Sequence, residues 1–192
     1  MRSKTFHLTT ILAAVSLIGL SLASTAQAEL NQPPEGFTAL FNGKDLTGWK
    51  GLLKGPYDNP DKRSALEPDK LAELQKEAND NMVAHWKVVD GVLVFDGKGR
   101  SLCTAKDYAD FEMLVDWKIE KAGDSGIYLR GAPQVQIWDT ALRTVGAQVG
   151  SGGLYNNQKN PSKPTKVADK PVGEWNTFRI IMIGENVTVY LN

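Results

Sequence analysis

Hydrophobic and polar side chains alternate along residues 123–139. Because successive side chains of a strand point to opposite faces, this alternation predicts two short strands, joined at residues 131–133 and entered through a tight polar turn at residues 123–126. One predicted face is aliphatic and carries Ile127, Leu129, Val135 and Ile137. The opposite face carries Tyr128, Arg130, Gln134, Gln136 and Trp138. This second face suits a ligand rich in hydroxyl groups, although a solvated outer sheet face would show the same pattern.

The same two-residue period recurs in other segments of the chain. Residues 111–120 form the longest alternating stretch, with Phe111, Met113, Val115, Trp117 and Ile119 on the face predicted to be buried. Residues 86–95 read as a hairpin, because the central Asp-Gly pair supplies the positive φ angles of a two-residue turn. Further strands are predicted at residues 101–104, 173–183 and 187–192.

A single helix interrupts these strand patterns. Pro68 is tolerated in a first helical turn, and Leu71 and Leu74 follow it at i, i+3 spacing, which predicts a helix over residues 69–78. Residues 51–63 are predicted to be a loop. Strand signals every 8–12 residues, separated by Gly-rich turns, indicate an all-β sandwich with one inserted surface helix.

Two carboxylates share the outward face of the predicted strand 111–120. Glu112 and Asp116 are four residues apart, which places them about 13 Å apart along a strand. That separation exceeds the roughly 5–5.5 Å between the carboxyl groups of a retaining glycosidase. A partner from a neighbouring strand, such as Asp139, would be required for that chemistry.

The N-terminus has the pattern of a signal peptide over residues 1–28. Arg2 and Lys4 precede an apolar run over residues 11–22, and Ala26-Gln27-Ala28 fits the small-x-small cleavage pattern. The run is shorter than the roughly 20 residues of a membrane span, so no stable membrane anchor is expected after cleavage. We expect an exported protein, periplasmic or secreted, with one domain over residues 29–192.

Charge, cysteine and histidine content narrow the function classes. Without residues 1–28 the chain has 20 basic and 22 acidic residues and no basic run, which argues against nucleic-acid binding. Cys103 is the only cysteine, so no disulfide can form within the chain, and His85 is the only histidine after residue 28. A multi-histidine zinc site is thereby excluded. We expect no cofactor and no metal in the site, while a structural calcium ion held by Asp and Asn loops stays open.

Several blocks resemble, in order, the 3-keto-disaccharide hydrolase domain family (formerly domain of unknown function 1080). The similarity begins with the Phe-x-x-Leu-Phe-Asn-Gly-Lys-Asp-Leu-x-Gly-Trp block at residues 37–49. Later blocks include Asp-Ser-Gly-Ile-Tyr-Leu-Arg at residues 124–130, Gln-Val-Gln-Ile-x-Asp at residues 134–139 and Gly-Glu-Trp-Asn at residues 173–176. Together the blocks cover nearly the whole chain after residue 28, and it is their joint match that is specific.

The resemblance implies a concanavalin A-like jelly roll that binds ligands on its concave sheet. Family members continue past the position of Asn192 with further strands, so we expect that C-terminal strands are missing from this chain. The segment over residues 54–84, which contains the predicted helix, is longer than in the common family pattern. Its role is unassigned.

The resemblance also implies a small carbohydrate substrate already oxidised at C3. The ketone acidifies the hydrogen at C2, so a base can remove that proton, the glycosidic oxygen at C1 can leave, and water addition completes a net hydrolysis. Arg130 would stabilise the enolate, and Asp139, Glu112 and Asp116 are the candidate bases. The expected substrate-binding residues are Tyr128, Gln134, Gln136, Trp138, Tyr155, Asn156 and Asn157.

Other interpretations of these residues stay open at this stage. A non-catalytic carbohydrate-binding module or an adhesion domain could share the fold. Arg130 could instead form an ion pair with Glu112 or Asp116, and Asp124 could cap its own turn.

Overall fold

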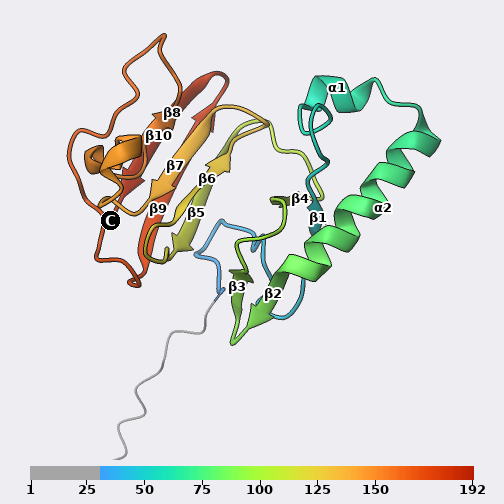
Figure 1. Ribbon diagram of the computed structural model, residues 1–192, viewed down its shortest axis with the longest axis horizontal. Helices are drawn as coiled ribbons and strands as arrows, with labels where there is room; N and C mark the ends of the chain where they lie inside the picture. The colour runs from blue at the N-terminus through green and yellow to red at the C-terminus, as the bar shows by residue number, and fades with distance from the viewer. Residues whose placement is uncertain (1–30) are drawn as a thin grey trace, which may run out of the picture. The chain divides into compact units, whose positions relative to one another are not determined.

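The computed structural model describes residues 31–192, which form one compact unit (Figure 1). The signal peptide predicted over residues 1–28 lies outside the described residues. Two α-helices and ten strands make up the described part of the chain. The α-helices are α1 (Pro60–Ser64) and α2 (Pro68–His85), and short 3-10 turns occupy Arg143–Val145 and Ala147–Val149. The strands are β1 (Trp49–Gly51), β2 (Trp86–Val89), β3 (Val92–Phe95), β4 (Leu102–Thr104), β5 (Phe111–Trp117), β6 (Asp124–Tyr128), β7 (Gln134–Trp138), β8 (Leu154–Tyr155), β9 (Asn176–Ile183) and β10 (Asn186–Leu191).

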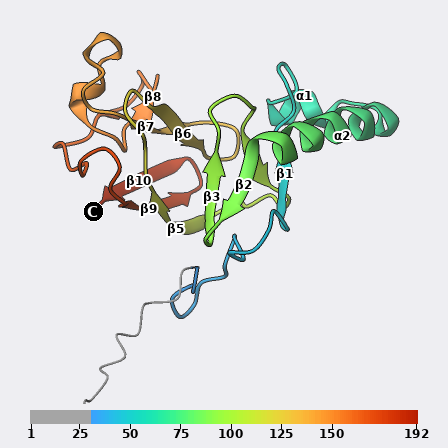
Figure 2. The ribbon, with the colours of Figure 1, turned by 60° about the horizontal axis from the view of Figure 1, so that its bottom comes forward.

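All strand pairs are antiparallel, and the predicted all-β class is confirmed. Two three-stranded sheets have the orders β10-β9-β5 and β6-β7-β8, and the two-stranded pairs β1-β4 and β2-β3 lie to one side of them, next to α2 (Figures 1 and 2). The hairpin predicted over residues 86–95 forms as β2 and β3. Asp90 and Gly91 have φ angles of 49° and 77° in the turn between β2 and β3, as a two-residue turn requires.

The two three-stranded sheets pack through their apolar faces to form the core. Val135 of β7 and Phe178 and Ile180 of β9 are fully buried. The alternation of β5 is confirmed, because Phe111, Met113 and Val115 pack against this cluster while the intervening side chains are exposed. The core cluster consists of Trp117, Leu129, Val135, Ile137, Phe178, Ile180 and Met182.

The helical part differs from the prediction in number and length. The predicted loop over residues 51–63 contains α1, whose first turn is capped by the Asn59 side chain, which accepts hydrogen bonds from the backbone N–H groups of Asp61 and Lys62. The predicted helix over residues 69–78 instead runs for 18 residues to His85. Its extension begins with Asn79-Asp80-Asn81, residue types of low helix propensity, and tertiary hydrogen bonds explain why they are helical.

Side-chain amides of α2 act as hydrogen-bonding partners for β1. Asn79 Oδ1 accepts the Gly51 backbone N–H at 3.0 Å, and Gln75 Nε2 donates to the Gly51 carbonyl at 2.9 Å. Asn81 Oδ1 likewise accepts the Arg100 backbone N–H at 2.8 Å. The helix approaches so closely that a Cβ atom on Gly51 would lie 1.9 Å from the carbonyl oxygen of Ala78. Only glycine fits this contact.

A second correction concerns the entry into β6. Asp124 already belongs to the strand, and the turn lies just before it, where the Gly123 N–H donates to the Glu120 carbonyl at 2.9 Å.

Within residues 31–192, no helix combines the length and the apolar character needed to cross a bilayer.

Replacing Asn79 by Ala is expected to destabilise the fold by about 1–3 kcal/mol, because the buried Gly51 N–H loses its acceptor. The measurement is the free energy of unfolding in urea. Asp80→Ala is the matched control, since Asp80 forms only an exposed ion pair with Lys76 and its loss should change stability little. Equal stability of Asn79→Ala and wild type would contradict the role given to this amide.

Candidate functional site

The predicted site residues are divided between the two outer faces of the sandwich. Glu112 and Asp116 lie on the outer face of the β10-β9-β5 sheet, since their neighbours in β5 point into the core. Both carboxylates have partners in β9: Glu112 Oε1 is 2.6 Å from Arg179 Nε, and Asp116 accepts a hydrogen bond from the Thr177 hydroxyl. The structure does not bring these two carboxylates together with the polar residues of β7.

Arg130 follows β6 and adopts a left-handed backbone conformation with φ 52°. Its guanidinium donates to the carbonyl of Ala109 at 3.4 Å and also to the carbonyl of Gly184 in the turn between β9 and β10. Arg130 therefore links the end of one sheet to the end of the other. The alternative ion pair with Glu112 or Asp116 is not formed, since Glu112 pairs with Arg179.

A row of three side chains crosses the outer face of the β6-β7-β8 sheet. The register pairs Tyr128 with Gln134 and Gln134 with Tyr155. The tyrosines are 56% and 50% exposed, and two strand spacings place their backbones roughly 9–10 Å apart. The two exposed aromatic side chains therefore flank Gln134 across the sheet.

Gly126 permits the orientation of the central amide in this row. A Cβ atom at residue 126 would lie 2.1 Å from Gln134 Nε2, so only glycine lets the Gln134 side chain lie across β6. In this position Gln134 Nε2 donates to the Ser125 carbonyl at 3.3 Å. Gly126, which was predicted to lie in a turn, belongs to β6. Because it has no side chain, it leaves space for Gln134 on the polar face.

The other two polar-face residues of β7 are buried. Gln136 is 3% and Trp138 is 8% exposed. Gln136 Nε2 donates to Asp124 Oδ1 at 2.6 Å and to the Ser125 carbonyl at 3.0 Å, and Trp138 Nε1 donates to the Gly150 carbonyl at 3.0 Å. Asp124 thus accepts from a neighbouring strand, and the turn cap considered for it is not what the structure shows.

Asp139 directly follows β7, and two backbone N–H groups occupy its carboxylate. Ala122 donates to Oδ2 and Ala141 to Oδ1, both at 2.9 Å, and the side chain is buried. The pKa of Asp139 lies below its ordinary value. The hydrogen bond from Ala122 is the largest cause, and the hydrogen bond from Ala141 is the next largest. A carboxylate held in this way is a weak proton acceptor.

An open depression lies at the end of the sandwich where β6 joins β7. It has a volume of about 410 Å³ and is largely open to solvent. Three segments contribute to it: the turn after β6, the end of β8 with the residues that follow, and the turn between β9 and β10. The lining residues are Ala132, Pro133, Leu154, Tyr155, Asn156, Asn157, Glu185 and Val187.

This depression contains three predicted residues and one that the sequence did not indicate. Tyr155, Asn156 and Asn157 were expected to contact substrate. Glu185 lies between the strands predicted at residues 173–183 and 187–192, and the local Gly-Glu-Asn pattern carries no information about which distant segment it faces. The depression therefore adds a carboxylate that sequence analysis missed.

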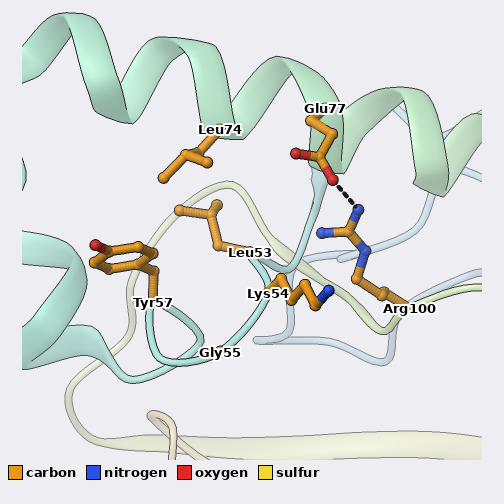
Figure 3. Close-up of a pocket in the computed structure, with 7 residues that line it drawn as sticks. All are labelled: Leu53, Lys54, Gly55, Tyr57, Leu74, Glu77 and Arg100. Atoms are coloured by element: carbon orange, nitrogen blue, oxygen red, sulfur yellow. Dashed lines mark hydrogen bonds and ion pairs between the residues drawn. The ribbon is translucent and has the colours of Figure 1, made fainter.

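A second, smaller cavity lies beside α2 (Figure 3). Leu53, Tyr57 and Leu74 point toward one another, and Arg100 pairs with Glu77 at 2.6 Å on one side. Its volume is about 140 Å³, below the range of small-molecule sites. Among residues 31–192, no group of three or more His, Cys, Asp or Glu side chains could hold a metal ion, and the expectation of a cofactor-free site stays a prediction.

A known protein family and a protein of known name are similar to this chain. Residues 36–192 match the family described as the 3-keto-alpha-glucoside-1,2-lyase-like domain. A 3-keto-disaccharide hydrolase of Bacteroides thetaiotaomicron is 24% identical over 198 residues, which cover 85% of this chain and 58% of that protein. The chain thus spans little more than half the length of this relative.

A crystal structure supports the fold. It is of a protein from Parabacteroides distasonis described as a candidate glycosyl hydrolase, and it superimposes with a TM-score of 0.53. The sequence identity is 24%, and the match covers 84% of this chain and 73% of the other. The jelly-roll class expected from the sequence is thereby confirmed.

Asp139→Asn is expected to lower stability most at neutral pH. Because the folded-state pKa lies below the ordinary value of 3.8, the ionised carboxylate stabilises the fold above about pH 3.8, and this contribution is lost as the pH falls through the folded-state pKa. The difference in unfolding free energy between wild type and Asp139→Asn should therefore shrink from pH 6 to pH 3. Glu174→Gln, at an exposed carboxylate, is the control; a difference for Asp139→Asn that is constant with pH would contradict this account.

Proposed function

The chain belongs to the family of 3-keto-alpha-glucoside-1,2-lyase-like domains, and from this membership we propose that it cleaves glycosides oxidised at C3, with 3-keto-disaccharides as the substrate class. Within the structure, the proposal is carried by the exposed row of Tyr128, Gln134 and Tyr155, because this row leads into the depression. The curated relative bears the name of the same activity.

The proposed reaction is an elimination followed by addition. A base removes the proton at C2, the electron pair of the C–H bond passes into the enolate of the C3 ketone, and the bond between C1 and the glycosidic oxygen breaks. The departing oxygen takes up a proton. Addition of water across the resulting C1–C2 double bond then gives the free 3-keto sugar, so the sum of the two steps is hydrolysis.

We place one sugar ring between Tyr128 and Tyr155, above Gln134. Tyrosine side chains offer an apolar face and a hydroxyl group, which matches a sugar ring with C–H faces and hydroxyl edges. The amide of Gln134 would bind hydroxyls, and Asn156 and Asn157 would contact the part of the substrate that enters the depression. Gln136 and Trp138 are too buried for direct contact with the substrate. We propose that they support the strands that carry the row.

Arg130 remains the proposed stabiliser of the enolate oxygen. A guanidinium has five N–H donors, and the two carbonyls that accept from Arg130 leave others available. One of those carbonyls belongs to Gly184, the residue before Glu185 of the depression. The cation is therefore held close to the proposed site by bonds to the backbone.

The three carboxylates first considered as bases do not line the depression. Glu112 and Asp116 have partners on the opposite outer face, and the pKa of Asp139 is lowered by its two N–H donors. We therefore propose that none of these three residues removes the C2 proton.

A non-catalytic carbohydrate-binding module is the second candidate function. The two exposed tyrosines favour it, since such a pair could hold a sugar without any acid–base group.

We also propose, from the pattern of residues 1–28, that the protein is exported. Mass spectrometry of the protein recovered from the periplasm or medium should then find an N-terminus at Glu29.

The two candidates differ in what they do to a 3-keto-glucoside. Wild-type protein should release 3-keto-glucose or its C1–C2 enone, detected by chromatography with mass spectrometry. Tyr128→Ala and Tyr155→Ala should each raise KM about tenfold, which corresponds to roughly 1.4 kcal/mol of lost binding. Tyr190→Ala is the matched control, because Tyr190 is 52% exposed but lies in β10 on the other sheet.

Binding without product would favour the binding module instead. If Tyr128→Ala, Tyr155→Ala and Tyr190→Ala all had the same KM, the β6-β7-β8 face would not be the substrate-binding surface.

A further inference from the structure

The turn between β9 and β10 contributes Glu185 to the lining of the depression. Glu185 lines it together with Tyr155, Asn156 and Asn157, which come from the end of β8 and the residues that follow. A substrate in the depression would thus have a carboxylic residue and residues with amide and hydroxyl groups among its neighbours. This is the combination that proton abstraction next to a ketone requires: one acceptor for the proton and donors that hold the substrate oxygens.

The turn that carries Glu185 is held from two other segments. The N–H of Gly184 donates to Asp110 Oδ1 at 2.8 Å, and the carbonyl of Gly184 accepts from Arg130. Asp110 directly precedes β5, and Arg130 follows β6, so the turn is tied to both sheets. A hairpin turn without such ties would be among the most mobile parts of a sheet, whereas these bonds restrict where Glu185 can lie.

The oxygens of Glu185 are also unoccupied in the described part of the chain. No ion pair or side-chain hydrogen bond to this carboxylate is present within residues 31–192. Glu112, Asp116 and Asp139, in contrast, each accept at least one strong hydrogen bond. Of these four carboxylic residues, Glu185 is the one that lines the depression, and none of its lone pairs is taken up by a hydrogen bond within residues 31–192.

From this arrangement we propose that Glu185 is the general base that removes the C2 proton of the 3-keto sugar. The inference rests on the proposed function. The Glu185 carboxylate takes the proton and becomes a carboxylic acid, and the C–H electron pair forms the enolate. As the bond from C1 to the glycosidic oxygen breaks, the carboxylic acid returns its proton to that oxygen, and the carboxylate is regenerated.

The direct test is exchange of the C2 hydrogen of a 3-keto-glucoside with deuterium from heavy water, followed by NMR together with product release. Glu185→Gln in the full-length protein should lower both rates by about 10²–10⁴-fold while the dissociation constant from calorimetry changes less than about threefold. Glu174→Gln, at an exposed carboxylate outside the depression, should keep wild-type rates. Melting temperatures of all variants confirm that they are folded.

A second variant separates chemistry from structure. Glu185→Ala leaves room for a small carboxylate, so added formate should raise its rate at least about tenfold if the residue acts as a base. A lost rate that formate does not raise would overturn the assignment. Wild-type turnover with an equally active Glu185→Gln would overturn it while leaving the proposed function intact, whereas a wild type with neither exchange nor product would remove both.

Discussion

The packing of two sheets through one apolar face determines where every functional side chain of this domain lies. Val135, Phe178 and Ile180 are fully buried between the sheets, and the two-residue period of a strand then fixes which neighbours point outward. A slip of one residue in β7 would exchange Val135 and Ile137 for Gln134 and Gln136 in the core. The loss of their apolar burial prevents that slip, so the polar row above β7 is a direct consequence of core packing.

The contact between α2 and β1 follows a different rule. Here hydrogen bonds decide the structure: Asn79 and Gln75 satisfy both polar backbone groups of Gly51, and no sheet partner does so from that side. The sequence predicted the start of α2 from Pro68 but not its extension to His85, because Asn79, Asp80 and Asn81 favour a helix end when judged locally. Their side chains bond to residues 51 and 100, which a local pattern cannot reveal.

The same limit explains which parts of the site could be predicted. Alternation placed Tyr128, Gln134, Gln136 and Trp138 on one face, and the register of β6 and β7 agrees with it. It could not show that residues near Gly150 cover Trp138 and leave Gln134 accessible. Nor could it assign Glu112 and Asp116 to the opposite outer face, since the period of a strand distinguishes two faces but does not say which sheet packs on which.

The carboxylates of the chain are distinguished by what already occupies their oxygens. Asp139 accepts two backbone N–H groups at one end of β7, and Glu112 is paired with Arg179 on the far sheet. The two hydrogen bonds to Asp139 stabilise its charged form and lower its pKa, which suits a structural role. Glu185 differs in its contacts, because the bonds that order its turn are made by the backbone of Gly184, and its own carboxylate has no hydrogen-bond partner within residues 31–192. Order in the backbone combined with an unoccupied side chain is the condition under which a surface glutamate can act on a bound substrate, and in the depression it is met at this turn.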